Sequence, residues 1–271
     1  SPMSRGLGDV YKRQGIIGGT GLIDLAKHSK SLDGIEIDRI DEVLVETKYG
    51  EVPLTCIKLS KNAQTKELIF LQRHHNNGKP NMPPHNINHK ANISALNDAN
   101  CEAIVSVCSV GAIAECLPPG KVVLAGQYID FTGVATSFFD EFAVFTSVTE
   151  PFCEELNILL EKVLRKSQQF ANQEKLFYTY WLAHGPHFET RAEVDAIEKL
   201  GGDMVGMTMA REVKLSNELG IPYSAICISS NWAAGREPGH PGADLNHESV
   251  SHQANSKLGP VWDCITELLE K

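Results

Sequence analysis

Short apolar runs that suit β-strands alternate with longer segments of helical periodicity along this 271-residue chain. Strands are expected at residues 15–17, 68–71, 103–108, 121–125, 177–182 and 223–229. Helices are expected at 86–97, at 151–166 with Pro151 in the first position, after Phe188 as far as Gly201, at 210–219 and at 250–269. Because strands and helices alternate rather than segregate, the sequence predicts an α/β fold with a mixed, largely parallel sheet.

The sequence predicts one domain. No linker, internal repeat or low-complexity segment divides residues 15–271. Residues 1–14, SPMSRGLGDVYKRQ, differ in character from the rest and are expected to be a leader or sequence-assembly leftover outside that domain. They lack the apolar segment of a signal peptide, and no apolar run approaches the roughly 20 residues of a membrane helix.

The charge and the cysteines exclude several classes of protein. A formal net charge of -9 repels a long polyanion, so nucleic-acid binding is disfavoured, whereas a small anion responds to local donors. The seven cysteines are odd in number and form no C-x-x-C pair, which disfavours a disulfide framework or a zinc ribbon. We therefore expect reduced core thiols and a cytoplasmic location.

Several predicted strand ends carry groups suited to binding phosphate. The first strand runs into Gly18-Gly19-Thr20-Gly21, where glycines let backbone N–H groups approach an anion. The second strand ends at Arg73, whose planar guanidinium matches phosphate oxygens. Open α/β sheets bind ligands at such carboxyl ends, and helix starts favour anions. The candidate phosphate-binding residues are Thr20, Arg73, His74, Cys108, Ser109 and Thr208.

A second group of residues suits a purine nucleoside. Phe188 can cover a flat ring, and Glu189 can accept a ring N–H. Asn231 offers both a donor and an acceptor, which matches a purine that presents O6 and N7. The candidate substrate-binding residues are Phe188, Glu189, Met207, Asn231, Trp232 and Ala233.

Each motif also has a purely structural explanation. The glycine-rich segment fits a tight turn, Arg73 fits an ion pair with a surface carboxylate, and Glu189 fits a helix cap. The histidines at 74, 75, 85 and 89 are dense, yet they form no H-E-x-x-H pattern and no acidic residue lies between Arg73 and Asp98. No metal site is therefore expected.

Taken together and in this order, the motifs resemble the purine nucleoside phosphorylase and methylthioadenosine phosphorylase family, from Gly15 to about Ile265. The chain is most similar to the 6-oxopurine nucleoside phosphorylases, because Asn231-Trp232-Ala233 stands where methylthioadenosine phosphorylases carry Asp-x-Asp. The resemblance implies the nucleoside-phosphorylase fold, with a partly barrel-like sheet flanked by helices, and usually a homotrimer. It also implies purine salvage without a cofactor, with inorganic phosphate as co-substrate and a small purine nucleoside as partner.

The resemblance further implies a role for each site residue. Phosphate is held by Thr20, Arg73, His74, Thr208 and the turn at Cys108 and Ser109. Met207 lies on the ribose, and His247 contacts the 5′ position. Glu189 and Asn231 hydrogen-bond the base, and Phe188 lies on its face. Asn231 and His74 are the expected catalytic residues, the first on the leaving purine and the second on the attacking phosphate.

Departures from the family pattern leave the 5′ specificity open. The loop after His74 is longer than usual, and a histidine of relatives is replaced around Pro80. Arg211 replaces a proline, and His187 an arginine or serine. Phe145 stands where thio-nucleoside enzymes place a histidine. The apolar Phe145 suits the methylthio group of 5′-methylthioinosine or methylthioadenosine, whereas His247 suits a 5′-hydroxyl.

Two alternatives of another class remain. A dinucleotide-dependent oxidoreductase would use the glycine-rich segment, but Asp24 stands where the third glycine of G-x-G-x-x-G belongs. The acidic candidates for a ribose contact, Glu36 and Asp38, follow no clean apolar strand. A nucleoside-binding protein that has lost catalysis would keep the same pocket.

Overall fold

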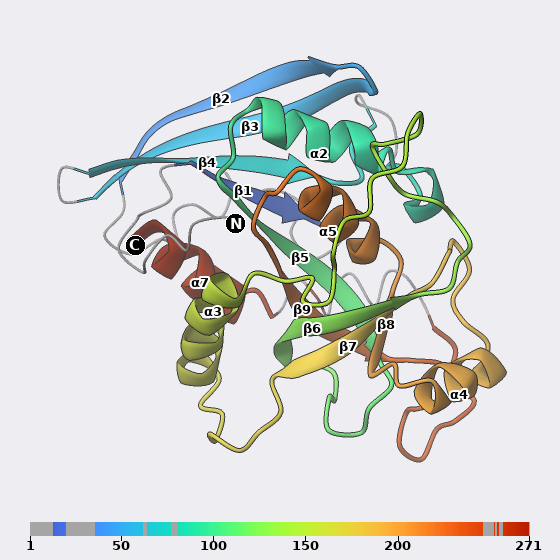
Figure 1. The fold of residues 1–271 in the computed structure, drawn as a ribbon. Coiled ribbons are helices and arrows are strands. Elements are labelled where there is room, and N and C mark those ends of the chain that lie inside the picture. Colours follow the sequence, from blue (N-terminus) through green and yellow to red (C-terminus); the bar gives the residue numbers. More distant parts are fainter. Residues whose placement is uncertain are drawn as a thin grey trace.

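One nine-stranded sheet organises the molecule (Figure 1). The computed structural model describes residues 13–19, 36–61, 64–76, 81–245, 252, 254 and 257–270. The strand order is β2-β3-β4-β1-β5-β8-β7-β6-β9. The strands are β1 Arg13–Gly18, β2 Glu36–Thr47, β3 Gly50–Lys61, β4 Gln64–Gln72, β5 Ala103–Ala112, β6 Val122–Asp130, β7 Phe177–Leu182, β8 Met204–Gly206 and β9 Tyr223–Trp232.

The sheet closes on itself at one end. Strand β5 pairs with β8 and also with β9, so β5, β8, β7, β6 and β9 form a closed ring. The directions are mixed: β1 is parallel to β4 and β5, and β5 is parallel to β9, whereas β5–β8 and β6–β9 are antiparallel. The mixed, partly barrel-like sheet confirms the predicted fold class.

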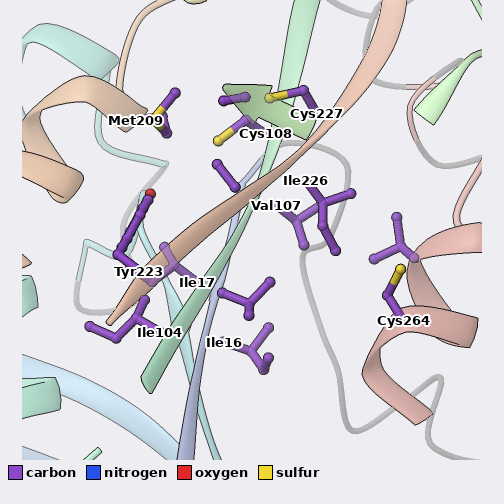
Figure 2. Close-up of a cluster of buried hydrophobic side chains, with 14 of the residues drawn as sticks. Ile16, Ile17, Ile104, Val107, Cys108, Met209, Tyr223, Ile226, Cys227 and Cys264 are labelled. Atoms are coloured by element: carbon purple, nitrogen blue, oxygen red, sulfur yellow. The ribbon is translucent and has the colours of Figure 1, made fainter. Parts of the chain in front are cut away.

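The central strands are buried along nearly their whole length because both of their faces are covered. Nine of the ten residues of β5 are buried, and β1 and β9 are nearly as enclosed. Ile17 and Ile104 lie on one face of these strands, and Val107 and Ile226 lie on the other (Figure 2). Strands buried on both faces give continuous apolar runs, which is why their sequences are easy to recognise.

Five α-helices and a short 3₁₀ helix lie in the described part of the chain. Helix α2 packs beside α5, and α3 packs beside α7 (Figure 1). The helices are η2 Pro84–Asn86, α2 His89–Asp98, α3 Glu154–Ser167, α4 Arg191–Lys199, α5 Met209–Glu218 and α7 Gly259–Glu270.

Some boundaries differ from the sequence-based prediction. Helix α3 begins at Glu154 instead of Pro151, with Cys153 as its N-cap residue. The helix expected from residue 86 is a 3₁₀ turn followed by α2, because Asn88 caps α2 by accepting from the Ala91 N–H. The expected helix start at residue 250 lies outside the described residues.

The first strand begins at Arg13, two residues before the predicted domain boundary at residue 15. The Gln14 side chain donates to the carbonyl of Leu268 at 2.8 Å, and the Arg13 carbonyl accepts from the Glu102 N–H. Arg13 and Gln14 are therefore integral to the fold, while residues 1–12 lie outside the described part.

All seven cysteines are free thiols. Cys101, Cys108, Cys227 and Cys264 are buried, as expected of core thiols, whereas Cys116 is exposed. Among the helices of the described residues, none is both long and apolar enough to cross a membrane.

Candidate active site

A cavity of about 370 Å³ opens where β4, β5, β8 and β9 end. Nine of the residues predicted for the site line it: Arg73, His74, Ser109, Phe188, Glu189, Met207, Thr208, Asn231 and Ala233. They come from segments spread between positions 73 and 233, and the crossing of strands in the closed sheet brings them together. Their common location supports the prediction that they form a single site.

Four predicted residues do not line this cavity or lie outside the description. Cys108 is buried, with its Sγ 3.6 Å from Arg73 Nη2. Trp232 follows Asn231 at the end of β9 without reaching the cavity wall. Thr20 and His247 fall outside the described residues. The predicted turn at Cys108 is instead regular strand, because β5 continues to Ala112.

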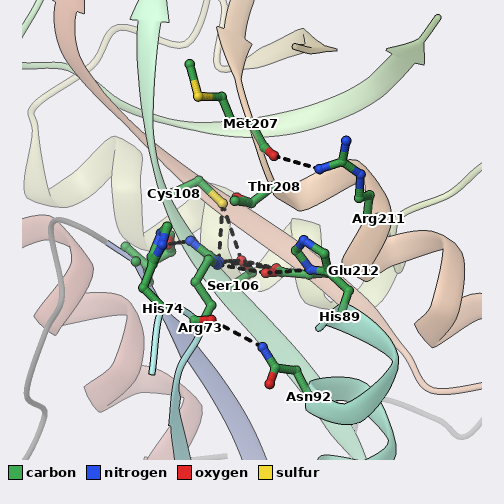
Figure 3. Close-up of polar contacts among 12 residues, drawn as sticks. Arg73, His74, His89, Asn92, Ser106, Cys108, Met207, Thr208, Arg211 and Glu212 are labelled. Carbon is green, nitrogen blue, oxygen red and sulfur yellow. Dashed lines mark hydrogen bonds and ion pairs between the residues drawn. The ribbon is translucent and has the colours of Figure 1, made fainter. Parts of the chain in front are cut away.

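Arg73 forms a buried ion pair with Glu212 (Figure 3). Its side chain is 2% exposed, and its Nε donates to Glu212 Oε1 at 2.7 Å. Nη2 donates to Glu212 Oε2 at 3.2 Å, and Nη1 donates to the Val107 carbonyl at 2.9 Å. Nη2 also lies 2.5 Å from Ser106 Oγ. Of the five N–H bonds of a guanidinium, one on Nη1 has no partner among the described residues, and Arg73 lines the cavity.

Glu212 is the centre of this network. Its carboxylate also accepts hydrogen bonds from Ser106 Oγ at 3.0 Å and from Tyr223 Oη at 2.9 Å. Burial alone would raise the pKa of Glu212, but the adjacent Arg73 guanidinium overrides that effect and holds the pKa below its ordinary value. The pair is therefore ionised, and Glu212 largely compensates the charge of Arg73.

His89 stands beside the pair and stays neutral (Figure 3). Its Nδ1 is 3.9 Å from Glu212 Oε1, and burial lowers the pKa of His89 to about 4. A neutral imidazole here adds no charge beside Arg73, which lines the cavity.

Two hydroxyl groups face the cavity close to Arg73. Ser109 Oγ is buried and has no hydrogen-bond partner among the described residues. Thr208 is 7% exposed and is the N-cap residue of α5, yet its side chain makes no capping hydrogen bond. Both hydroxyls are thus placed to donate to an anion, next to the positive end of a helix.

His74 is oriented by the loop that follows it. Its Nδ1 lies 2.8 Å from the Met82 carbonyl oxygen, which can only accept, so Nδ1 carries a proton. The backbone N–H of His74 donates to Gln72 Oε1 at 2.9 Å. The ring orientation is therefore fixed at the cavity wall that His74 shares with Met82.

The cavity is also lined by a carboxylate and a carboxamide, those of Glu189 and Asn231. Glu189 Oε1 is buried without a hydrogen-bond partner in the described structure, and burial raises the pKa of Glu189. Ser230 Oγ donates to Asn231 Oδ1 at 2.9 Å, and Asn231 Nδ2 donates to the Trp232 carbonyl at 2.8 Å. These two bonds fix the carboxamide and leave one Nδ2 hydrogen for a ligand.

Several site residues were missed in the sequence. Glu212 contacts Arg73 across 139 positions, and Ser230 Oγ lies 3.2 Å from the Val110 carbonyl oxygen, 120 positions away. Only an acidic residue on the otherwise buried face of α5 hinted at Glu212. The loop after His74 supplies part of the wall. The additional lining residues are Asn81, Met82, Pro83, Pro84, Val110, Gly111, Pro186, Val205, Gly206, Ser230 and Leu245.

A metal centre finds no support in the described part of the chain. Within it, no group of three or more histidine, cysteine, aspartate or glutamate side chains is arranged to hold a metal ion.

The chain belongs to the Phosphorylase superfamily, whose family model matches residues 13–262. This membership sets aside the oxidoreductase alternative. Glu36 and Asp38, the acidic residues that this alternative needed, lie on β2 at the edge of the sheet, away from the cavity.

Named relatives fall into two groups. A 6-oxopurine nucleoside phosphorylase of Pyrococcus furiosus is 34% identical over 248 residues, covering 88% of this chain and 84% of its own. A probable S-methyl-5'-thioinosine phosphorylase of Methanocaldococcus jannaschii is 35% identical over 253 residues, covering 93% and 91%. Among solved structures, a methylthioadenosine phosphorylase of Schistosoma mansoni in complex with adenine shares the fold, with a TM-score of 0.79, 24% identity and coverage of 97% and 91%.

Proposed function

We propose that this protein cleaves the glycosidic bond of 6-oxopurine nucleosides with inorganic phosphate, releasing the free base and ribose 1-phosphate. One observation carries the proposal: a single cavity is lined by Arg73, Ser109 and Thr208 and also by Glu189 and Asn231. Ser109 Oγ and Glu189 Oε1 are both buried without a partner among the described residues. Relatives named for 6-oxopurine nucleosides and for S-methyl-5'-thioinosine support it.

The chemistry follows from the charges that develop. Breaking the C1′–N9 bond builds positive charge on the ribose and negative charge on the purine. A phosphate held by Ser109, Thr208 and Nη1 of Arg73 stabilises the first charge and then attacks C1′. Phosphate is itself the nucleophile, so positioning and preorganised electrostatics supply the rate acceleration without a cofactor.

Asn231 and Glu189 select the base. The remaining Nδ2 hydrogen of Asn231 donates to N7 or O6 as negative charge grows on the leaving purine. An ionised Glu189 accepts the N1–H that hypoxanthine and guanine carry and adenine lacks. Both features favour 6-oxopurines over adenine.

A second candidate substrate is 5′-methylthioinosine, with methylthioadenosine as its 6-amino counterpart. It is favoured by the relative named for S-methyl-5'-thioinosine and by Phe145, an apolar residue with 96% of its side chain exposed. The base contacts would be unchanged, and the difference would lie at the 5′ end, where His247 is the competing candidate.

We further propose a homotrimer that works in purine salvage in the cytoplasm. Phe131, Phe142 and Phe145 are 70%, 64% and 96% exposed on the segment between β6 and α3. Exposed apolar area of this kind is typical of protein–protein interfaces. A second copy of the chain that covers this segment would remove them from water.

The test is release of free base from inosine, guanosine, adenosine and 5′-methylthioinosine, with and without phosphate. We expect strictly phosphate-dependent release, with inosine or guanosine well ahead of adenosine. Faster turnover of methylthioinosine than of inosine would select the second candidate. No release from any nucleoside would instead identify a binding protein without catalysis.

A further inference from the structure

Helix α5 starts at the cavity in an unusual way. Threonine at an N-cap normally turns its hydroxyl back to accept from the N–H groups of the first helical turn. Thr208 has φ −136° and ψ −53°, and its side chain makes no such bond. The helix start is therefore stabilised by something other than its own N-cap side chain.

Tyr180 holds the backbone of Thr208, the N-cap residue of α5. It lies on β7, its side chain is fully buried, and its Oη accepts a hydrogen bond from the Thr208 N–H at 3.2 Å. The ring fits because residue 206 is glycine, since a Cβ there would stand 2.4 Å from the Tyr180 oxygen. Burial raises the pKa of Tyr180, so its hydroxyl remains neutral over the working pH range.

We propose that Tyr180 is a positioning residue of the phosphate site: its Oη accepts from the Thr208 N–H, fixes the backbone of this N-cap residue, and so holds the Thr208 hydroxyl, which does not cap α5, toward the phosphate. Thr208 lines the cavity beside Ser109, whose buried hydroxyl has no partner among the described residues. The inference rests on the proposed phosphorolysis, because it needs phosphate to be the anion bound there.

Removing only the hydroxyl tests this role. In Tyr180→Phe we expect the KM for phosphate to rise roughly five- to tenfold, the worth of one hydrogen bond, with the nucleoside KM changed less than twofold. Tyr178→Phe is the matched control: it lies on the same strand, and its hydroxyl bonds to the Cys116 and Lys175 carbonyls, away from the cavity. An unchanged phosphate KM in Tyr180→Phe would overturn the proposal.

Thr208→Ala tests the same idea without touching the core. Because the hydroxyl does not cap α5, the melting temperature should stay at the wild-type value while the phosphate KM rises. A drop in melting temperature of the size expected for a lost cap contradicts the proposal. This variant decides the matter even if Tyr180→Phe fails to fold.

The double variant shows whether the two residues act together. If Tyr180 acts through the Thr208 hydroxyl, Tyr180→Phe should add little to the phosphate KM of Thr208→Ala. Full additivity of the two effects would show that Tyr180 acts elsewhere. A wild-type protein without phosphate-dependent cleavage refutes the proposed function itself, which distinguishes that failure from a failure confined to Tyr180.

Discussion

At the scale of single residues, the cavity is marked by polar groups that the protein leaves unsatisfied. Ser109 Oγ and Glu189 Oε1 are buried without partners in the described structure. A buried polar group without a hydrogen bond costs about 1–3 kcal/mol, so such groups are rare unless a ligand completes them. Both residues line the cavity, and in the proposed complex Ser109 contacts the phosphate and Glu189 contacts the purine base.

Asn231→Asp tests the base contact. The substitution replaces the Nδ2 donor with a carboxylate, which repels the negative charge that develops on the leaving purine. We expect the barrier for inosine phosphorolysis to rise by about 2–4 kcal/mol, with a smaller loss for adenosine. Steady-state kcat/KM for both nucleosides measures this, and an unchanged inosine preference would refute the role of Asn231 as base reader.

Glu189 predicts a pH dependence. Burial raises its pKa above the ordinary 4.5, so it loses its charge at a higher pH than an exposed glutamate does. We expect kcat/KM for inosine to fall as the pH drops through this raised pKa. Glu189→Gln should lower kcat/KM roughly 10- to 100-fold at neutral pH and keep only the acidic limb that comes from phosphate. An identical acidic limb in both proteins would exclude Glu189 as its source.

The same residue links function to stability. A carboxyl whose pKa is raised by folding favours the folded state below the unfolded pKa, and that contribution is lost as the pH rises through the folded pKa. In the absence of ligand at neutral pH, Glu189→Gln should therefore have a higher melting temperature than the wild type. Calorimetry without nucleoside checks this expectation.

Residues in local motifs were easier to predict than their partners. Phe188, Glu189, Thr208 and Asn231 stand next to strand ends or helix starts, so the sequence marks them. The pairing of Arg73 with Glu212 joins residues 139 positions apart, and its one local trace is an acidic residue on the otherwise buried face of α5. The sequence therefore predicted Arg73 as an open donor fork, whereas the structure buries most of its donors.

At the scale of elements, an ion pair joins the first turn of α5 to the end of β4. Glu212 on α5 holds Arg73, which follows β4, and also accepts from Tyr223 at the start of β9. Such a contact joins three elements through one carboxylate, so its loss should loosen all of them together.

Glu212→Gln should lower the free energy of unfolding by about 3–5 kcal/mol, because it leaves the buried Arg73 charge uncompensated. Glu161→Gln, which breaks a more exposed pair with Arg165, should cost less than about 1 kcal/mol of unfolding free energy.

Folding depresses the pKa of Glu212, so the contribution of Glu212 to the free energy of unfolding is present above the ordinary pKa of 4.5 and is lost as the pH falls. Urea unfolding at neutral and acidic pH measures both effects, and equal losses in the two variants would contradict this account.

Buried elements were predictable and edge elements were not. Continuous apolar runs marked β5 and β9, which are enclosed on both faces. The long hairpin of β2 and β3 was missed because β2 is an edge strand in which most residues are exposed, so its sequence lacks a buried face. Charged residues along such an edge also discourage pairing with other chains.

At the scale of the whole molecule, closure of the sheet assembles the site. Pairing of β5 with both β8 and β9 is set by contacts far apart in sequence. The order of strands was therefore beyond what local patterns can indicate, and the barrel was expected only through the family resemblance.

The proposed trimer can be tested in solution. Light scattering should give three times the chain mass of 29.7 kDa, and Phe142→Ser/Phe145→Ser should yield monomers because it removes exposed aromatic area. Ile158→Ser is the control, since Ile158 is 54% exposed on α3, outside that segment. A double variant that keeps the wild-type mass would place the interface elsewhere.

The position of β5 has a consequence for how the protein loses its activity on heating. Its residues 109–111, which form the cavity floor, are hydrogen-bonded into β9, and Gly111 also pairs with β8. Amide protons there should exchange with deuterium only through global unfolding. Heat inactivation and loss of tertiary structure should therefore coincide at one temperature, without a folded but incompetent intermediate.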